Sequence, residues 1–106
     1  MALTFGNHMD NVTPRTAARL IAGMTQGTRD IGTRWDTLSE ESRSELIHRW
    51  EREISDRPTE AADLIVASIA SHSELAAAWN GLGEHLHQNR VLLIQTIISN
   101  TVHEPR

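Results

Sequence analysis

The chain has 106 residues, a net charge of −4, and no cysteine, lysine or tyrosine. The missing thiols and amines exclude a disulfide framework, a thiolate zinc site and catalysis by a cysteine or lysine nucleophile. The length indicates one domain with a single modest core, large enough to fold without disulfides or a structural metal.

Residues 1–12 show no apolar periodicity, so we expect a flexible lead in front of a single helical domain over residues 13–106. Thr13-Pro14 is typical of a helix start, because threonine can cap free backbone N–H groups and proline at the first helical position loses no hydrogen bond. The apolar residues that follow predict a helix over 14–26. Ile31 and Trp35, four residues apart, predict a second short helix or a 3₁₀ turn.

A long amphipathic helix is predicted over residues 40–54. Thr37-Leu38-Ser39-Glu40 matches a capping box, and the acids at 40 and 41 favour the positive end of the helix dipole. Pro58 ends this helix, because proline disfavours helical geometry in the residue before it. Thr59 is then expected to cap the next helix. The apolar stripe of the 40–54 helix consists of Leu46, Ile47, Trp50 and Ile54.

Residues 59–70 are apolar around most of a helix circumference, which places this helix at the centre of the domain. Ser71-His72-Ser73-Glu74 matches a second capping box and indicates a break after it. Beyond the break, apolar residues keep helical spacing across Gly81 and Gly83, although each glycine costs about 1 kcal/mol in a helix. We therefore favour one continuous helix over 74–102, with a hairpin at the glycines as the alternative.

These elements predict an all-α fold, a small bundle of four to five helices with a long C-terminal helix as its spine. No apolar run approaches the roughly 20 residues that span a bilayer. The first residues also lack the basic and apolar regions of a signal peptide, so we expect a cytoplasmic protein with no membrane partner. The arginine-only set of basic residues is typical of GC-rich coding sequences and favours a bacterial or phage origin.

No motif of an active site or metal site is present. His85 and His87 are two residues apart, whereas two metal ligands on one helix need a spacing of three or four. A zinc site that adds His72 or His103 is a weaker alternative. The serines at 39, 71 and 73 are better explained as helix caps than as nucleophiles. We therefore predict no catalytic residue, no metal, no cofactor and no enzymatic activity.

A basic segment leaves DNA binding as an alternative function. A helix-turn-helix unit has a small residue in its first helix, a glycine about four residues later and exposed arginines on its second helix. From Ala22 the glycine arrives one residue late, at Gly27, and the net negative charge disfavours general binding to nucleic acid. The candidate DNA-contacting residues are Arg15, Arg19, Arg29 and Arg34.

The leading hypothesis is a protein interaction module that forms a homodimer and also binds an unidentified protein partner. Residues 91–94 are four consecutive apolar residues, which point around most of a helix, so a small monomer would leave part of them exposed to water. On this hypothesis, Ile94→Glu with Ile98→Glu gives a folded monomer. The expected interface residues are Leu86, Val91, Ile94, Ile97, Ile98 and Val102.

Overall fold

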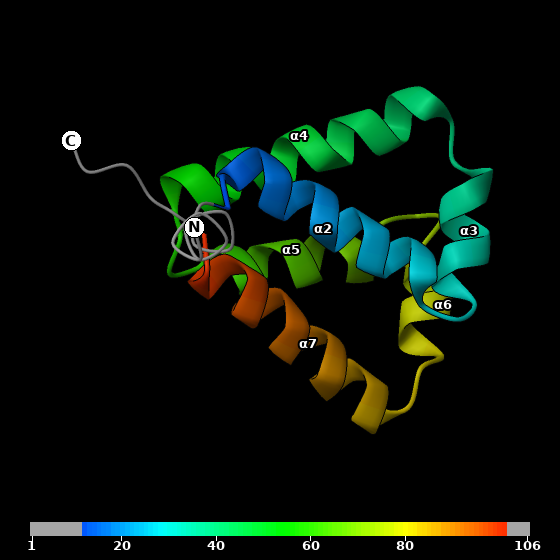
Figure 1. The fold of residues 1–106 in the computed structure, drawn as a ribbon. Coiled ribbons are helices and arrows are strands. Elements are labelled where there is room, and N and C mark those ends of the chain that lie inside the picture. The colour runs from blue at the N-terminus through cyan, green and yellow to red at the C-terminus, as the bar shows by residue number, and fades with distance from the viewer. Residues whose placement is uncertain (1–11, 102–106) are drawn as a thin grey trace, which may run out of the picture.

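The computed structural model describes residues 12–101, which are helical apart from turns, short links and one isolated bridge between Val12 and Thr101 (Figure 1). The all-α fold class is confirmed for this range. Its helix count is higher than the expected four to five, because the C-terminal region divides in two. The six helices are α2 (Pro14–Gly27), α3 (Ile31–Thr37), α4 (Glu40–Asp56), α5 (Ala61–Ala70), α6 (Ala76–Asn80) and α7 (Glu84–Ser99).

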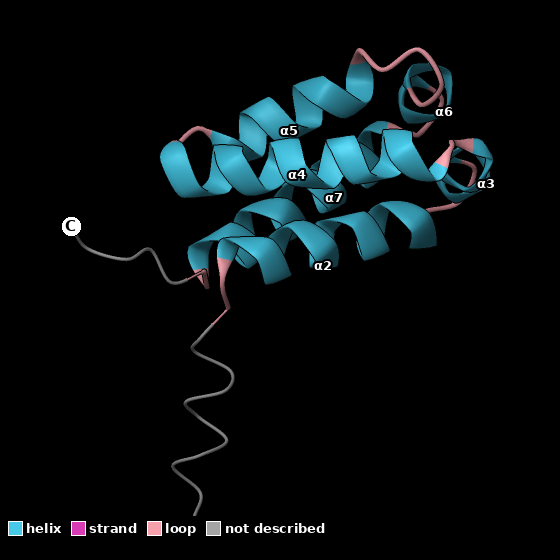
Figure 2. Cartoon of the chain, turned by 90° about the horizontal axis from the view of Figure 1, so that it is seen from above, coloured by secondary structure: helices cyan, strands magenta, loops and turns pink. Residues whose placement is uncertain are grey.

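The four longer helices α2, α4, α5 and α7 run along the length of the bundle, and the short helices α3 and α6 close one end (Figures 1 and 2). The bridge between Val12 and Thr101 joins the start of α2 to the end of α7 at the opposite end. Residues 1–11 of the expected flexible lead lie outside the described residues, whereas Val12 packs partly against the core. Within residues 12–101, no helix has the length and apolar content needed to cross a membrane.

The helix starts follow local capping chemistry. The Thr16 N–H donates to Thr13 Oγ1 at 3.1 Å at the start of α2, and the Ser42 N–H donates to Ser39 Oγ at 3.1 Å at the start of α4. Ser39 rather than Thr37 therefore supplies the α4 cap, and Thr37 Oγ1 instead donates to the Arg34 carbonyl inside α3. The expectation that Thr59 caps the next helix is wrong, since Glu60 occupies the position before α5.

The continuous helix expected over 74–102 is also wrong. α6 ends at Asn80 and α7 begins at Glu84, with Gly83 in extended backbone between them. This turn folds α7 back along the bundle, so Trp79 and Ile94 are buried in the same core, at 5% and 0% exposure. A straight helix would carry α7 away from the other helices and leave its apolar residues in water.

The core is organised around Trp50 of α4, which is fully buried. Its ring stacks on Trp35 of α3, with the centroids 5.9 Å apart. Its indole Nε1–H donates to Ser68 Oγ of α5 at 2.8 Å, and that hydroxyl donates in turn to the Ile65 carbonyl at 2.6 Å. One side chain thus links three helices, and its single polar atom has a partner, as a buried donor requires.

The link between α2 and α3 is tight. The Ile31 N–H donates to the Arg29 carbonyl at 2.7 Å across Asp30, whose φ of 69° and ψ of −47° form a γ-turn that is strained for any residue with a Cβ. The turn brings α3 so close to α2 that a Cβ at position 32 would clash with the backbone carbonyl of Gln26. Gly32 is therefore required by the close approach of two backbones.

Ser68→Ala is expected to lower the free energy of unfolding by about 1–3 kcal/mol, because the buried Trp50 N–H loses its only acceptor. Chemical denaturation followed by tryptophan fluorescence measures this change. Ser71→Ala is the matched control, since Ser71 lies just past the end of the same helix, is exposed and donates to the Ala67 carbonyl at 2.7 Å. Equal losses in the two variants would show that the Trp50–Ser68 bond contributes nothing.

Gly32→Ala is expected to destabilise the protein by about 3 kcal/mol or more, because the added methyl group forces α3 away from the Gln26 carbonyl. Gly23→Ala is the control, since Gly23 is exposed within α2 and a Cβ there meets no atom within 4 Å. That variant should gain about 0.5–1 kcal/mol from better helix propensity. Thermal unfolding of both variants tests the α2–α3 contact, and a stable Gly32→Ala protein would contradict it.

Candidate interaction surface

α7 differs from α4 in its lack of charge. Its 16 residues include two charged ones, Glu84 and Arg90. The 17 residues of α4 include nine, made up of five glutamates, one aspartate and three arginines. Charged side chains are depleted at the centres of protein interfaces, because contact strips them of water. The surface of α7 therefore has the composition of an interface, and that of α4 has the composition of a solvated helix.

Exposed leucines gather on the same helix. Within residues 12–101, four large apolar side chains are exposed, and three of these belong to α7. They are Leu86 at 37%, Leu92 at 58% and Leu93 at 42%, and the fourth is Leu20 of α2 at 48%. Two exposed polar but uncharged residues, Asn89 and Thr96, lie one helical turn from the central leucines. We call Leu86, Asn89, Leu92, Leu93 and Thr96 the α7 outer face.

The interface residues expected from the sequence differ in their exposure in the structure. Ile94 and Ile98 are buried within the chain itself, at 0% and 6% exposure, so these two belong to the core and cannot contact a second chain. Val91 and Ile97 are half-buried, and Val102 lies outside the described residues. Leu86 is exposed. The sequence reasoning missed Leu92 and Leu93, although both belong to the apolar run that suggested an interface.

The inner side of α7 is fixed by an aromatic contact. The His87 ring stacks on Trp79 with the centroids 4.7 Å apart, and its Nε2–H donates to the Trp79 carbonyl. Since His85 is exposed and His87 is engaged with α6, the two histidines do not share a ligand. Arg90 Nε is also buried, with no hydrogen-bond partner among the described residues. The core-facing side of α7 is therefore already occupied by contacts within the chain.

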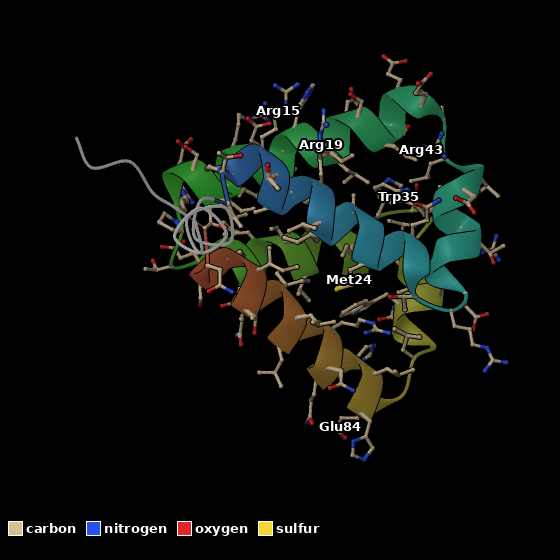
Figure 3. All side chains as sticks on the ribbon, viewed as in Figure 1. Arg15, Arg19, Met24, Trp35, Arg43 and Glu84 are labelled. Atoms are coloured by element: carbon tan, nitrogen blue, oxygen red, sulfur yellow. The ribbon has the colours of Figure 1, made fainter. Side chains whose placement is uncertain are left out.

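The four arginines of the DNA-binding alternative are all exposed but are not brought together. Arg15 and Arg19 lie on the edge of α2 that faces α4 (Figure 3), and Arg19 lines a depression between those two helices. Arg34 lines a different depression, against α6. The exposed side of α3 also carries Asp36, which offsets the charge of Arg34. Within the described range, these four arginines therefore form no continuous basic surface of the kind that follows a DNA backbone.

The depressions beside α4 hold the remaining clusters of polar side chains. Arg43 points from α4 toward Trp35 (Figure 3), and its guanidinium donates to the carbonyls of Trp35 and Asp36 at 3.4 and 3.5 Å. Arg49 pairs with Glu53 at 3.3 Å. These arginines thus serve helix packing and surface pairing. Across residues 12–101, no hydroxyl is hydrogen-bonded to a histidine or carboxylate, and no three metal-binding side chains converge.

Comparisons with protein-family models, with curated proteins and with solved structures find no match for this chain. The α7 outer face is the candidate interaction surface. It carries three of the four large apolar side chains that are exposed within residues 12–101, and it lies at the margin of the bundle (Figure 1).

Ile94→Glu with Ile98→Glu is expected to unfold the protein, because two carboxylates enter an apolar core that offers them no partner. Leu92→Glu with Leu93→Glu adds the same charge on the exposed side of the same helix and should leave the fold intact, since both leucines are exposed. Circular dichroism and thermal melting compare the two variants. A folded Ile94/Ile98 variant would contradict the assignment of these residues to the core.

Proposed function

We propose that this protein is a small helical interaction module that acts through protein–protein contacts and self-associates through the α7 outer face. The observation that carries the proposal is the exposure of Leu92 and Leu93, at 58% and 42%, on a helix with only two charged residues. Burying a leucine contributes about 1.5–3 kcal/mol, so covering this face favours association. Such a module suits an adaptor, an inhibitor or a small regulatory protein.

The charge distribution supports α7 over the other surfaces. Each chain carries a net charge of −4, so two copies repel one another over most of their approach. Contact through α4 would also strip water from its nine charged side chains, at a cost that ion pairing only partly returns. The α7 outer face consists of leucine, asparagine and threonine, so contact through it removes no charged side chain from water. The same properties would let it receive the apolar surface of another protein.

The contact is expected to be modest in strength. Specific interfaces bury about 1,600 Å² in total, and those below about 1,200 Å² belong to weak or transient complexes. A single 16-residue helix provides an area at the small end of this range. The chain has its own core around Trp50, so it does not need a partner to fold. We therefore propose a concentration-dependent dimer of folded monomers.

Light scattering after size exclusion, over a series of protein concentrations, tests self-association. The wild-type mass should rise toward that of a dimer with concentration, and Leu92→Glu with Leu93→Glu should remain monomeric. Ser44→Glu with Ser55→Glu on α4 is the matched control, because it adds the same charge at two exposed positions. The control should dimerise like the wild type. A wild-type chain that stays monomeric up to its solubility limit would contradict the self-association.

A further inference from the structure

The central part of the α7 outer face, from Asn89 to Thr96, has a pattern that reads similarly from either end of the helix. Leu92 and Leu93 occupy its centre, Asn89 lies three residues before Leu92, and Thr96 lies three residues after Leu93. All four side chains are exposed. A two-fold axis through the midpoint of this pattern exchanges its two halves, and a homodimer interface requires such self-complementarity.

We infer that the α7 outer face is covered by α7 of a second copy, running antiparallel about a two-fold axis between Leu92 and Leu93. This inference rests on the proposed function and specifies the partner and the geometry of that surface. In this arrangement Leu92 packs on the partner's Leu93, and Leu93 packs on the partner's Leu92. The four leucines form one apolar centre, which neither chain can build alone.

Polar residues on either side of the leucines set the register. Asn89 faces the partner's Thr96, and Thr96 faces the partner's Asn89. An asparagine amide and a threonine hydroxyl can each donate and accept a hydrogen bond, so each pair can satisfy itself when water is removed. A shift of the helices by one turn would place Asn89 and Thr96 against leucine and leave their polar groups without partners. Uncharged polar pairs specify register in this way in other helix–helix contacts.

Charge favours the antiparallel orientation. In the proposed register Glu84 reaches beyond the last turn of the partner helix, and Arg90, whose Nε is buried, lies away from the contact. No like charges face one another. A parallel pairing would instead place the two positive N-terminal ends of α7 side by side, and likewise the two negative C-terminal ends, which costs energy by repulsion. α7 also lies at the margin of the bundle (Figure 1).

Cysteine cross-linking tests the register directly, because the chain has no cysteine of its own. Asn89→Cys with Thr96→Cys should form a covalent dimer under mild oxidation, seen by electrophoresis without reductant. The two positions are seven residues apart on one helix, about 10 Å, which is too far for a disulfide within one chain. Any disulfide is therefore between chains. Each single variant should remain near background, since its thiol faces no other thiol.

Gln88→Cys with Gln95→Cys is the matched control. These positions are also exposed and seven residues apart, but they lie about a quarter turn or more around the helix from Asn89 and Thr96. The control pair should cross-link no faster than the single variants. Adding Leu92→Glu and Leu93→Glu to the Asn89/Thr96 pair should abolish its cross-link.

The outcomes separate this inference from the proposed function. Dimers in light scattering together with a cross-link specific to the 89/96 pair support both. Dimers without that cross-link, or with equal cross-linking of the control pair, overturn the antiparallel register and leave self-association standing. A wild-type chain that stays monomeric at every concentration overturns both.

Discussion

The burial of Trp50 constrains the positions of three helices at once. Its ring stacks on Trp35 and its indole N–H bonds to Ser68, so α3, α4 and α5 must meet at one point in the core. The strained turn at Asp30 and the close approach at Gly32 follow from this requirement, because the short α3 has to fold back against α2 to place Trp35 on Trp50. Backbone strain of this kind persists where surrounding packing over-determines the conformation.

α7 is attached to this framework on one side. Ile94 and Ile98 enter the core, and the Trp79–His87 stack holds the beginning of the helix. Among residues 12–101, no other helix covers the opposite side, so Leu92 and Leu93 face solvent. The candidate surface therefore lies on the side of α7 that the described helices leave uncovered. It is separate from the residues that stabilise the fold.

The candidate surface could be predicted only in part from sequence. The run 91–94 indicates that some apolar residues must be exposed, because four consecutive residues point around most of a helix. Which of these four residues is buried depends on which side of the helix faces the core. Leu75, Trp79 and Leu82 come before the turn at Gly83 and are buried. After the turn, α7 is rotated relative to the helical spacing that these residues begin. Leu86 and Leu93, which continue that spacing, are therefore exposed, and Ile94 is buried instead. The apolar residues keep helical spacing across Gly83, so the spacing alone does not predict which side of α7 is buried.

The sequence by itself determined the all-α class, the capped starts of α2 and α4 and the amphipathic face of α4, because propensity, capping and periodicity act within a few residues. Tertiary structure alone decided that α6 and α7 separate, that Trp50 bonds to Ser68 and that Leu92 and Leu93 face outward. Each of these outcomes depends on contacts between residues distant along the chain. A glycine-containing helix and a turn differ locally by only about 1 kcal/mol per glycine, and burial of Trp79 and Ile94 in one core outweighs that difference.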